Sequence, residues 1–463
     1  MNEWIESALA TATLLPGAEH GAVVIIRETA EANIRWANNA LTTNGQMHRV
    51  TAEVVALAQV EGGTASGCLE GPVGSADDVI DLLRRAATVA AAGSPDEDAH
   101  DLPAGSVDDD FAAAGAPCGI EVFTAVSEGL GRAFQDAEGK HLFFGFAELV
   151  VTTTWLGTSA GARRRGVVRM GRLELNAKHP DMVGSAWVGR SSADFTDVDI
   201  DACVAEVLEQ LSWNQNRVEL PAGRYEVILP PGAVTDLWVY AYWMSAGREA
   251  REGQTAFAGK DGATRVGERL AAVPLSISSD PSLAGVERLP FVAVGASVAG
   301  SESVYDNGAE VGPITWLDRG VLNTLVETSH EQRANGLSGP LPYPTENLVI
   351  EAESQTSLDE MVASTKRGLL LTCLWYIRIV DPETLLMTGL TRDGVYLIED
   401  GQVVGAVNNF RWNESPVSLL GRISEVGKAE RNLCREWNDY FQLSIAPPVR
   451  VPDFNMSTVS KAF

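Results

Sequence analysis

Cysteine is scarce and scattered in this sequence. The 463 residues contain five cysteines, an odd number with no two close together: Cys68, Cys118, Cys203, Cys373 and Cys434. This spacing argues against a disulfide framework and against a zinc knuckle, because both need paired cysteines. The simplest interpretation is that the thiols stay reduced, as they do in the cytoplasm.

Histidine is also scarce, and its spacing excludes a zinc-peptidase helix. The closest two histidines, His20 and His48, are 28 residues apart, and the others are His100, His141, His179 and His330. Such a helix needs two imidazoles one turn apart, and a carboxylate that takes a proton from the metal-bound water. A zinc site would therefore have to be assembled from distant histidines.

His330 and Cys434 each allow a functional and a structural interpretation. His330 alone is followed by a glutamate, Glu331. The two form either an acid/base pair, joined by Asp318 in an independent hydrolase, or a partly exposed helix end, where histidine is favourable near the C-terminus. Cys434 is either a nucleophile or metal ligand, or a structural cysteine, and it has no neighbouring histidine.

Several other motifs are missing as well. No run reaches about 18 apolar residues, which argues against a membrane span. The acidic start, Met1 to Glu6, lacks the basic region of a signal peptide. The segment Gly295 to Ala299 lacks the second glycine of a serine-hydrolase elbow, and no Gly-x-Gly-x-x-Gly or phosphate-loop pattern is present.

Basic residues are far fewer than acidic ones, and the formal net charge is −27. A surface of this charge repels nucleic-acid phosphate, which argues against direct DNA binding. The one basic cluster, Arg163 to Arg165, follows a turn-like segment and has no interleaved aromatic residues. It predicts either a solvated hairpin tip or a contact with an acidic partner.

The length and patterning predict an α+β protein of several units. We expect an N-terminal α+β domain over 1–92, an acidic linker over 93–110, a central α+β domain over 111–220 and a larger β-rich C-terminal domain over 221–463. In the first unit, the runs Ala22–Ile26 and Ala32–Ala37 predict two strands, and Asn44-Gly45 predicts a hairpin turn. Ser75 is the expected cap of a helix.

The C-terminal block has the clearest local signals. Ser357 and Glu360 form the pattern of a capping box, which predicts a helix over 357–367 that ends at Gly368. The apolar run Leu369–Val380 predicts one long buried strand. Turn signals follow at Asp393-Gly394 and Asp400-Gly401.

The order of these pieces resembles the TldD/PmbA family, also called modulators of DNA gyrase. The resemblance begins with Asp318-Arg319-Gly320 and the turn Gly336–Gly339, and continues through Pro342–Ile350 to the block just described. The run Pro452–Ser460 resembles the closing strand of some members. The family contains zinc-peptidase subunits with a His-Glu-x-x-x-His helix, and subunits that have lost it.

The resemblance places the catalytic helix after the first strand of the C-terminal unit, where this chain has Leu237–Gly247. That stretch contains no histidine and no acid. The chain therefore resembles a TldE/PmbA-like, non-catalytic subunit of a TldD-type metallopeptidase, with no catalytic and no metal-binding residue of its own. The resemblance implies zinc only in a TldD-type partner, and a heteromer whose chamber admits unstructured peptides for degradation or processing.

By position in the resembling block, Arg319, His330 and Asn347 are the candidates for peptide or partner contact. The chain would form a heteromer with a TldD-type subunit, or a homodimer when alone. The alternatives are a stand-alone peptide-binding scaffold, and a hydrolase with an unrecognised site. Peptide would bind by strand addition, which uses backbone hydrogen bonds and demands no particular sequence.

Overall fold

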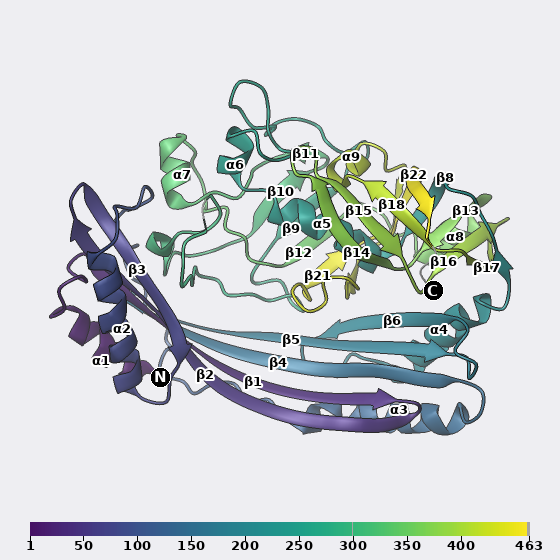
Figure 1. Ribbon diagram of the computed structural model, residues 1–463, viewed down its shortest axis with the longest axis horizontal. Coiled ribbons are helices and arrows are strands. Elements are labelled where there is room, and N and C mark those ends of the chain that lie inside the picture. Colours follow the sequence, from purple (N-terminus) through teal and green to yellow (C-terminus); the bar gives the residue numbers. More distant parts are fainter. Residues whose placement is uncertain (299, 461–463) are drawn as a thin grey trace.

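The computed structural model describes residues 1–298 and 300–460. It has the mixed helix and strand content of an α+β protein, which confirms the predicted fold class. Figure 1 shows a long curved sheet along one side of the molecule, and the C-terminal strands gathered on the other.

The long sheet is built from strands of both the first and the central segments of the chain. It is antiparallel throughout, in the order β3-β2-β1-β4-β5-β6. Its strands are β1 (Gly21–Ala37), β2 (Ala40–Val60), β3 (Gly63–Pro72), β4 (Leu142–Thr158), β5 (Arg163–Lys178) and β6 (Ser185–Ser192). Pairing of β1 with β4 joins residues 1–92 and 111–220 in one sheet.

The two strands expected at Ala22–Ile26 and Ala32–Ala37 are a single strand, β1, which is a correction to the sequence interpretation. The hairpin turn also lies elsewhere. Asn38 and Asn39 both have positive φ, 51° and 61°, which a tight two-residue hairpin turn requires. Asn44-Gly45 lies inside β2 instead, opposite Asn33 and Ile34.

Helices cover one face of this sheet. Alternate residues of β1 face them, because successive side chains of a strand point to opposite faces. Ala22, Val24 and Ile26 pack against α1 and α2, and Ala32, Ile34 and Trp36 pack against α3 and α4. The helices are α1 (Asn2–Ala12), α2 (Ala76–Ala91), the 3-10 turn η1 (Ile120–Phe123), α3 (Thr124–Asp136) and α4 (Ile200–Trp213).

The acidic segment 93–110 is attached to the fold at several points. The carboxylate of Asp96 accepts hydrogen bonds from the Ser66 N–H and the Tyr305 hydroxyl, both at 2.8 Å. Arg164 and Arg165 of the basic cluster pair with Asp108 and Asp110 of the same segment. The predicted solvated tip is therefore wrong for these two arginines, whose side chains are 7% and 11% exposed.

Two further sheets form the C-terminal half. The second sheet has the order β11-β10-β9-β12-β21-β20. Its strands are β9 (Ser276–Ser279), β10 (Ile314–Asp318), β11 (Val321–Leu322), β12 (Leu348–Glu351), β20 (Glu430–Asn432) and β21 (Ser444–Ala446).

The third sheet has the order β14-β15-β18-β22-β8-β13-β16-β17-β7, with β19 beside β22. Its strands are β7 (Arg217–Val218), β8 (Gly223–Leu229), β13 (Arg367–Leu371), β14 (Leu374–Asp381), β15 (Leu386–Thr391), β16 (Val395–Glu399), β17 (Gln402–Val407), β18 (Phe410–Glu414), β19 (Glu425–Val426) and β22 (Val449–Val459).

Helix α5 (Pro231–Trp243) shares the main core with both C-terminal sheets. The remaining helices are short: α6 (Gly247–Arg251), η2 (Val304–Asp306), α7 (Ser329–Ala334), α8 (Leu358–Ala363) and α9 (Pro416–Leu420). Within the residues described, none of the helices combines the length and apolarity needed to cross a bilayer.

The predicted caps at Ser75 and Ser357 are confirmed, and Ser357 with Glu360 forms a full capping box. Two boundaries were wrong. Helix α8 ends at Ala363, and Gly368 lies in β13, where an added Cβ would meet the Glu226 carbonyl oxygen at 3.1 Å. The expected strand Leu369–Val380 is two strands: β13 pairs with β8 and β16, whereas β14 lies at the edge beside β15.

Close packing of α2 on β3 provides a test of the first sheet. A Cβ at Gly67 would overlap the backbone of Ala86 and Ala90, whereas a Cβ at Gly71 would meet Leu82 at an ordinary 3.6 Å. We expect Gly67→Ala to destabilise the protein by about 1–3 kcal/mol, as overpacking does. Gly71→Ala is the matched control, and thermal unfolding of the two variants makes the comparison. Equal melting temperatures would contradict this packing.

Candidate functional site

Helix α5 occupies the place where a catalytic helix was expected, directly after β8. Pro231 begins it, at a position where the missing N–H costs no helical hydrogen bond. All residues from Ala233 to Tyr242 are buried. A helix that is covered on every side has its residues selected for packing.

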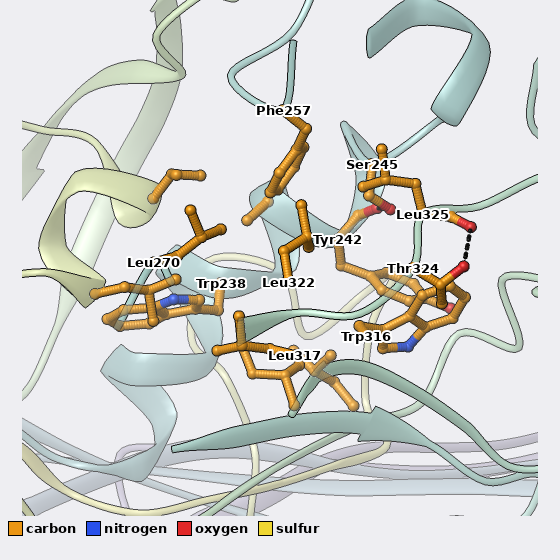
Figure 2. A pocket seen from close by; sticks show the side chains of 15 residues that line it. Trp238, Tyr242, Ser245, Phe257, Leu270, Trp316, Leu317, Leu322, Thr324 and Leu325 are labelled. Atoms are coloured by element: carbon orange, nitrogen blue, oxygen red, sulfur yellow. Dashed lines mark hydrogen bonds between the residues drawn. The ribbon is translucent and has the colours of Figure 1, made fainter. Parts of the chain in front are cut away.

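A small cavity beside α5 is lined almost entirely by apolar side chains (Figure 2). Its volume is about 50 Å³, and Trp238, Tyr242, Phe257 and Trp316 contribute to its wall. The hydroxyl of Thr324, which also lines it, already donates to the Leu325 carbonyl oxygen. Since a buried water needs two to four polar partners, such a cavity favours neither water nor a polar ligand.

One acid lies in α5 just before the stretch considered in the sequence. Asp236 is fully buried, and its two carboxylate oxygens accept the N–H groups of Arg435 (3.1 Å) and Glu436 (2.9 Å). Burial raises the pKa of Asp236 to about 8, although these two hydrogen bonds lower it. The hydrogen bonds of Asp236 therefore attach the loop after β20 to α5. An aspartate within an apolar helix was the sequence signal that could have identified it.

The sequence matches the model of a known protein family. Residues 222–458, slightly more than half of the chain, match the family described as PmbA/TldA metallopeptidase C-terminal domain. The chain belongs to the PmbA/TldD family. No curated protein sequence matches it.

Solved structures extend the likeness to nearly the whole length of this PmbA/TldD-family chain. TldE from Thermococcus kodakarensis superposes with a TM-score of 0.77 at 16% identity, over 96% of this chain and 99% of that one. A Thermotoga maritima protein, described as a candidate modulator of a DNA gyrase, gives 0.74 at 16% identity over 98% and 99%. A similarly described protein from Bacteroides thetaiotaomicron gives 0.75 at 15% identity over 99% of both chains. At these identities the likeness shows a shared fold.

The structure places the three sequence-derived contact candidates in different settings. Arg319 is exposed in the turn between β10 and β11, with φ 45°. His330 is half-buried at the second residue of α7, so the helix end expected for it is the N-terminal and not the C-terminal one. No hydrogen bond or ion pair among the described residues joins the three.

Asn347 is fully buried and its side chain is used inside the fold. Its amide donates to the carbonyl oxygens of Asp280 and Val286, both at 2.7 Å, and its Oδ1 accepts from the Thr345 hydroxyl at 3.0 Å. All these partners belong to segments that flank β9 and β12. The described contacts of Asn347 therefore organise the loops around β12.

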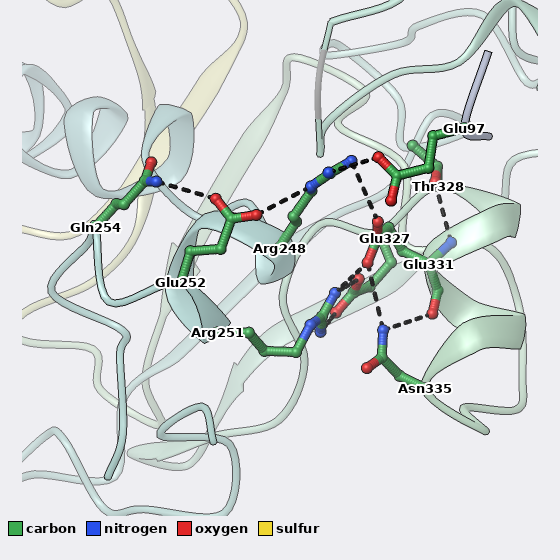
Figure 3. A network of polar contacts seen from close by, with 9 residues as sticks. All are labelled: Glu97, Arg248, Arg251, Glu252, Gln254, Glu327, Thr328, Glu331 and Asn335. Carbon is green, nitrogen blue, oxygen red and sulfur yellow. Dashed lines mark hydrogen bonds and ion pairs between the residues drawn. The ribbon is translucent and has the colours of Figure 1, made fainter. Parts of the chain in front are cut away.

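Glu331 belongs to a network of ion pairs that the sequence analysis did not anticipate (Figure 3). Arg251 of α6 pairs with Glu327 and Glu331, with N···O distances of 2.8 and 2.7 Å. Arg248 reaches Glu97 of the acidic segment at 2.7 Å. Hydrogen bonds to Glu327 raise the pKa of Arg251 above its ordinary value. The network joins α6, α7 and the acidic segment.

The buried cysteines are not activated thiols. Cys434 is fully buried, its Sγ lies 3.0 Å from the Phe441 carbonyl oxygen, and burial raises its pKa well above the ordinary value. Burial also raises the pKa of Cys373 to about 12. Because the thiolate is the nucleophile and the metal ligand, both residues suit packing. In the described part of the chain, no three His, Cys, Asp or Glu side chains are grouped to hold a metal ion.

The buried carboxyl of Asp236 makes stability depend on pH. In the unfolded chain its pKa is near 3.8, and in the folded chain it is about 8. Between these values the unfolded chain has lost the proton that the folded chain keeps, so the free energy of unfolding falls as pH rises. We expect the melting temperature to fall between about pH 5 and about pH 8 more steeply for the wild type than for Asp236→Asn. Parallel pH profiles would show that Asp236 does not titrate as described.

The ion-pair network predicts that a substitution which removes one negative charge strongly destabilises the protein. Glu327 is 3% exposed, and Glu327→Gln leaves part of the Arg251 charge without its partner. Loss of one partner of a buried pair costs about 3 kcal/mol. The control is Glu268→Gln, which breaks the more exposed Arg265–Glu268 pair and should cost less than about 1 kcal/mol. Thermal or urea unfolding measures both, and equal costs would contradict a structural role for the network.

Proposed function

We propose that this chain is the non-catalytic, TldE/PmbA-like subunit of a TldD-type zinc metallopeptidase complex. The complex would admit unstructured peptides and degrade or process them, in the reducing cytoplasm. The observation that carries the proposal is the composition of α5. At the place of the catalytic helix, Ala233 to Tyr242 are buried aromatic and aliphatic residues apart from Thr235 and the hydrogen-bonded acid Asp236.

The fold similarity to TldE from Thermococcus kodakarensis supports the same assignment. Zinc would be held only by the partner, because the place of the metal-binding helix in this chain offers no imidazole. The contribution left to this chain is physical. It would close the chamber, exclude folded proteins and present strand edges to an extended peptide.

The hydrolase alternative needs His330, Glu331 and Asp318 to act together. Glu331 is 12% exposed at its side chain and is engaged by Arg251, which supports a structural role for this acid. The stand-alone scaffold alternative also predicts a metal-free chain, but one that has no protease partner. Purification of the chain with and without a zinc-peptidase homologue tests both alternatives.

The test is to purify the chain alone and together with a His-Glu-x-x-x-His homologue from the same genome. We expect no zinc and no peptidase activity from the chain alone. The mixture should give one joint peak in size-exclusion chromatography and cleave an unstructured peptide. Zinc analysis and peptide cleavage followed by mass spectrometry are the measurements.

Two controls separate the alternatives. His330→Ala should at most weaken cleavage by the complex, as loss of one peptide or partner contact would, whereas abolished cleavage with the complex still formed would favour the hydrolase. A homologue whose two motif histidines are replaced by alanine should still form the complex and should be inactive. Stoichiometric zinc and activity in the isolated chain would overturn the proposal. Separate elution at every concentration would favour the stand-alone scaffold.

A further inference from the structure

A large cavity lies between the central segment and the C-terminal sheets. Its volume is about 880 Å³, within the range of ligand sites in proteins. Strand β6 and helix α4 form one wall, and α8, β20 and the hairpin between β16 and β17 form the other. Figure 1 shows β6 and α4 facing α8, β16 and β17 at the end of the molecule where α4 and β17 are labelled.

The edges of two sheets meet at this cavity. Strand β6 is the last strand of the long sheet, and its residues 187–190 line the cavity. Strand β20 is the last strand of the second sheet, and its residues 430–432 line the same space. An edge strand presents backbone N–H and C=O groups to an added strand, so the complementary ligand is an extended polypeptide.

The rim of the cavity is negatively charged. Its two arginines are already paired, Arg190 with Glu206 and Arg431 with Asp197. Two further carboxylates of the lining, Glu209 and Asp359, have no ion-pair or hydrogen-bond partner among the described residues, and Glu430 attracts Arg190 without forming a direct ion pair with it. The net negative charge at the rim attracts cations.

The interior of the cavity adds a polar acceptor and an apolar aromatic surface. Gln210 is 9% exposed, and its Oε1 has no hydrogen-bond partner among the described residues. A buried acceptor of this kind is costly unless a ligand supplies a donor. Trp213 is partly buried in the same lining and offers apolar surface to an aliphatic stem, whereas the ring of Trp187 is already covered by the Arg435 guanidinium at 4.6 Å.

We propose that this cavity binds an extended peptide segment that carries lysine or arginine side chains. The peptide backbone pairs with the β6 edge, a backbone or side-chain N–H reaches Gln210, and the cationic groups lie among Glu209, Asp359 and Glu430. The biological role of the site rests on the proposed function. In a peptide-processing complex, the site would be a second binding site for the substrate, in the non-catalytic subunit.

The test uses the isolated full-length chain and two fluorescein-labelled peptides, measured by fluorescence anisotropy. One peptide alternates lysine and valine, and the other has glutamate in place of each lysine. We expect the lysine peptide to bind, the glutamate peptide to bind at least about tenfold more weakly, and added salt to weaken the lysine peptide.

Matched variants separate this site from general attraction to an acidic protein. Glu209→Lys with Glu430→Lys should weaken the lysine peptide about tenfold, since two attractions become repulsions. Glu128→Lys with Glu138→Lys changes the net charge by the same amount at exposed residues outside the cavity, and should have little effect. All four positions are exposed, and melting temperatures check that the variants fold.

Hydrogen–deuterium exchange gives a second measurement. The lysine peptide should slow exchange of the amides at 187–190 in β6. The proposal is overturned if both peptides bind alike, if the two pairs of variants weaken binding equally, or if protection lies elsewhere. The Glu209→Lys/Glu430→Lys chain should still form the complex with its His-Glu-x-x-x-His homologue. Loss of complex formation by the wild type would overturn the proposed function and leave the peptide site standing.

Discussion

The burial of helix α5 from Ala233 to Tyr242 is the constraint on which the C-terminal half depends. The helix shares one continuous core with strands of both C-terminal sheets, including β8, β12 and β13. Its residues must therefore fill space on every side, and they are aromatic or aliphatic with the exception of Thr235 and Asp236. The acid is tolerated because two backbone N–H groups reach it.

The same acid connects the core to the long sheet. The loop held by Asp236 continues to Asn438 and Asp439, and both of these pair with Arg172 of β5. A second connection runs through the acidic segment, where Asp96 binds Tyr305 and Glu97 binds Arg248. The large cavity lies between β6 of one half and α8 of the other. The halves also share apolar contacts, since Val23 and Ile25 of β1 lie in one buried cluster with Phe291 and other residues of the C-terminal half.

Local signals in the sequence predicted the helix caps well but misplaced the first hairpin turn, which lies at Asn38-Asn39 and not at Asn44-Gly45. The caps at Ser75 and Ser357 depend on residues within one helical turn, and both are present in the fold. The signals failed where distant residues decide the outcome. Gly368 has the position of a helix-terminating glycine, but pairing with β8 and β16 draws it into a strand. The run from Leu369 to Val380 divides because β13 and β14 occupy different places in one sheet.

The sequence by itself determined the α+β class, the family and the lack of a two-histidine helix, since these follow from composition and from residues close together in the chain. Only the tertiary structure decided what surrounds each candidate residue. It placed Asn347 in the interior, paired Glu331 with Arg251, and joined the arginine cluster to the acidic segment. It also brought two sheet edges to one cavity. The physical reason is that burial and ion pairing are set by residues far apart in sequence, whose proximity no local pattern specifies.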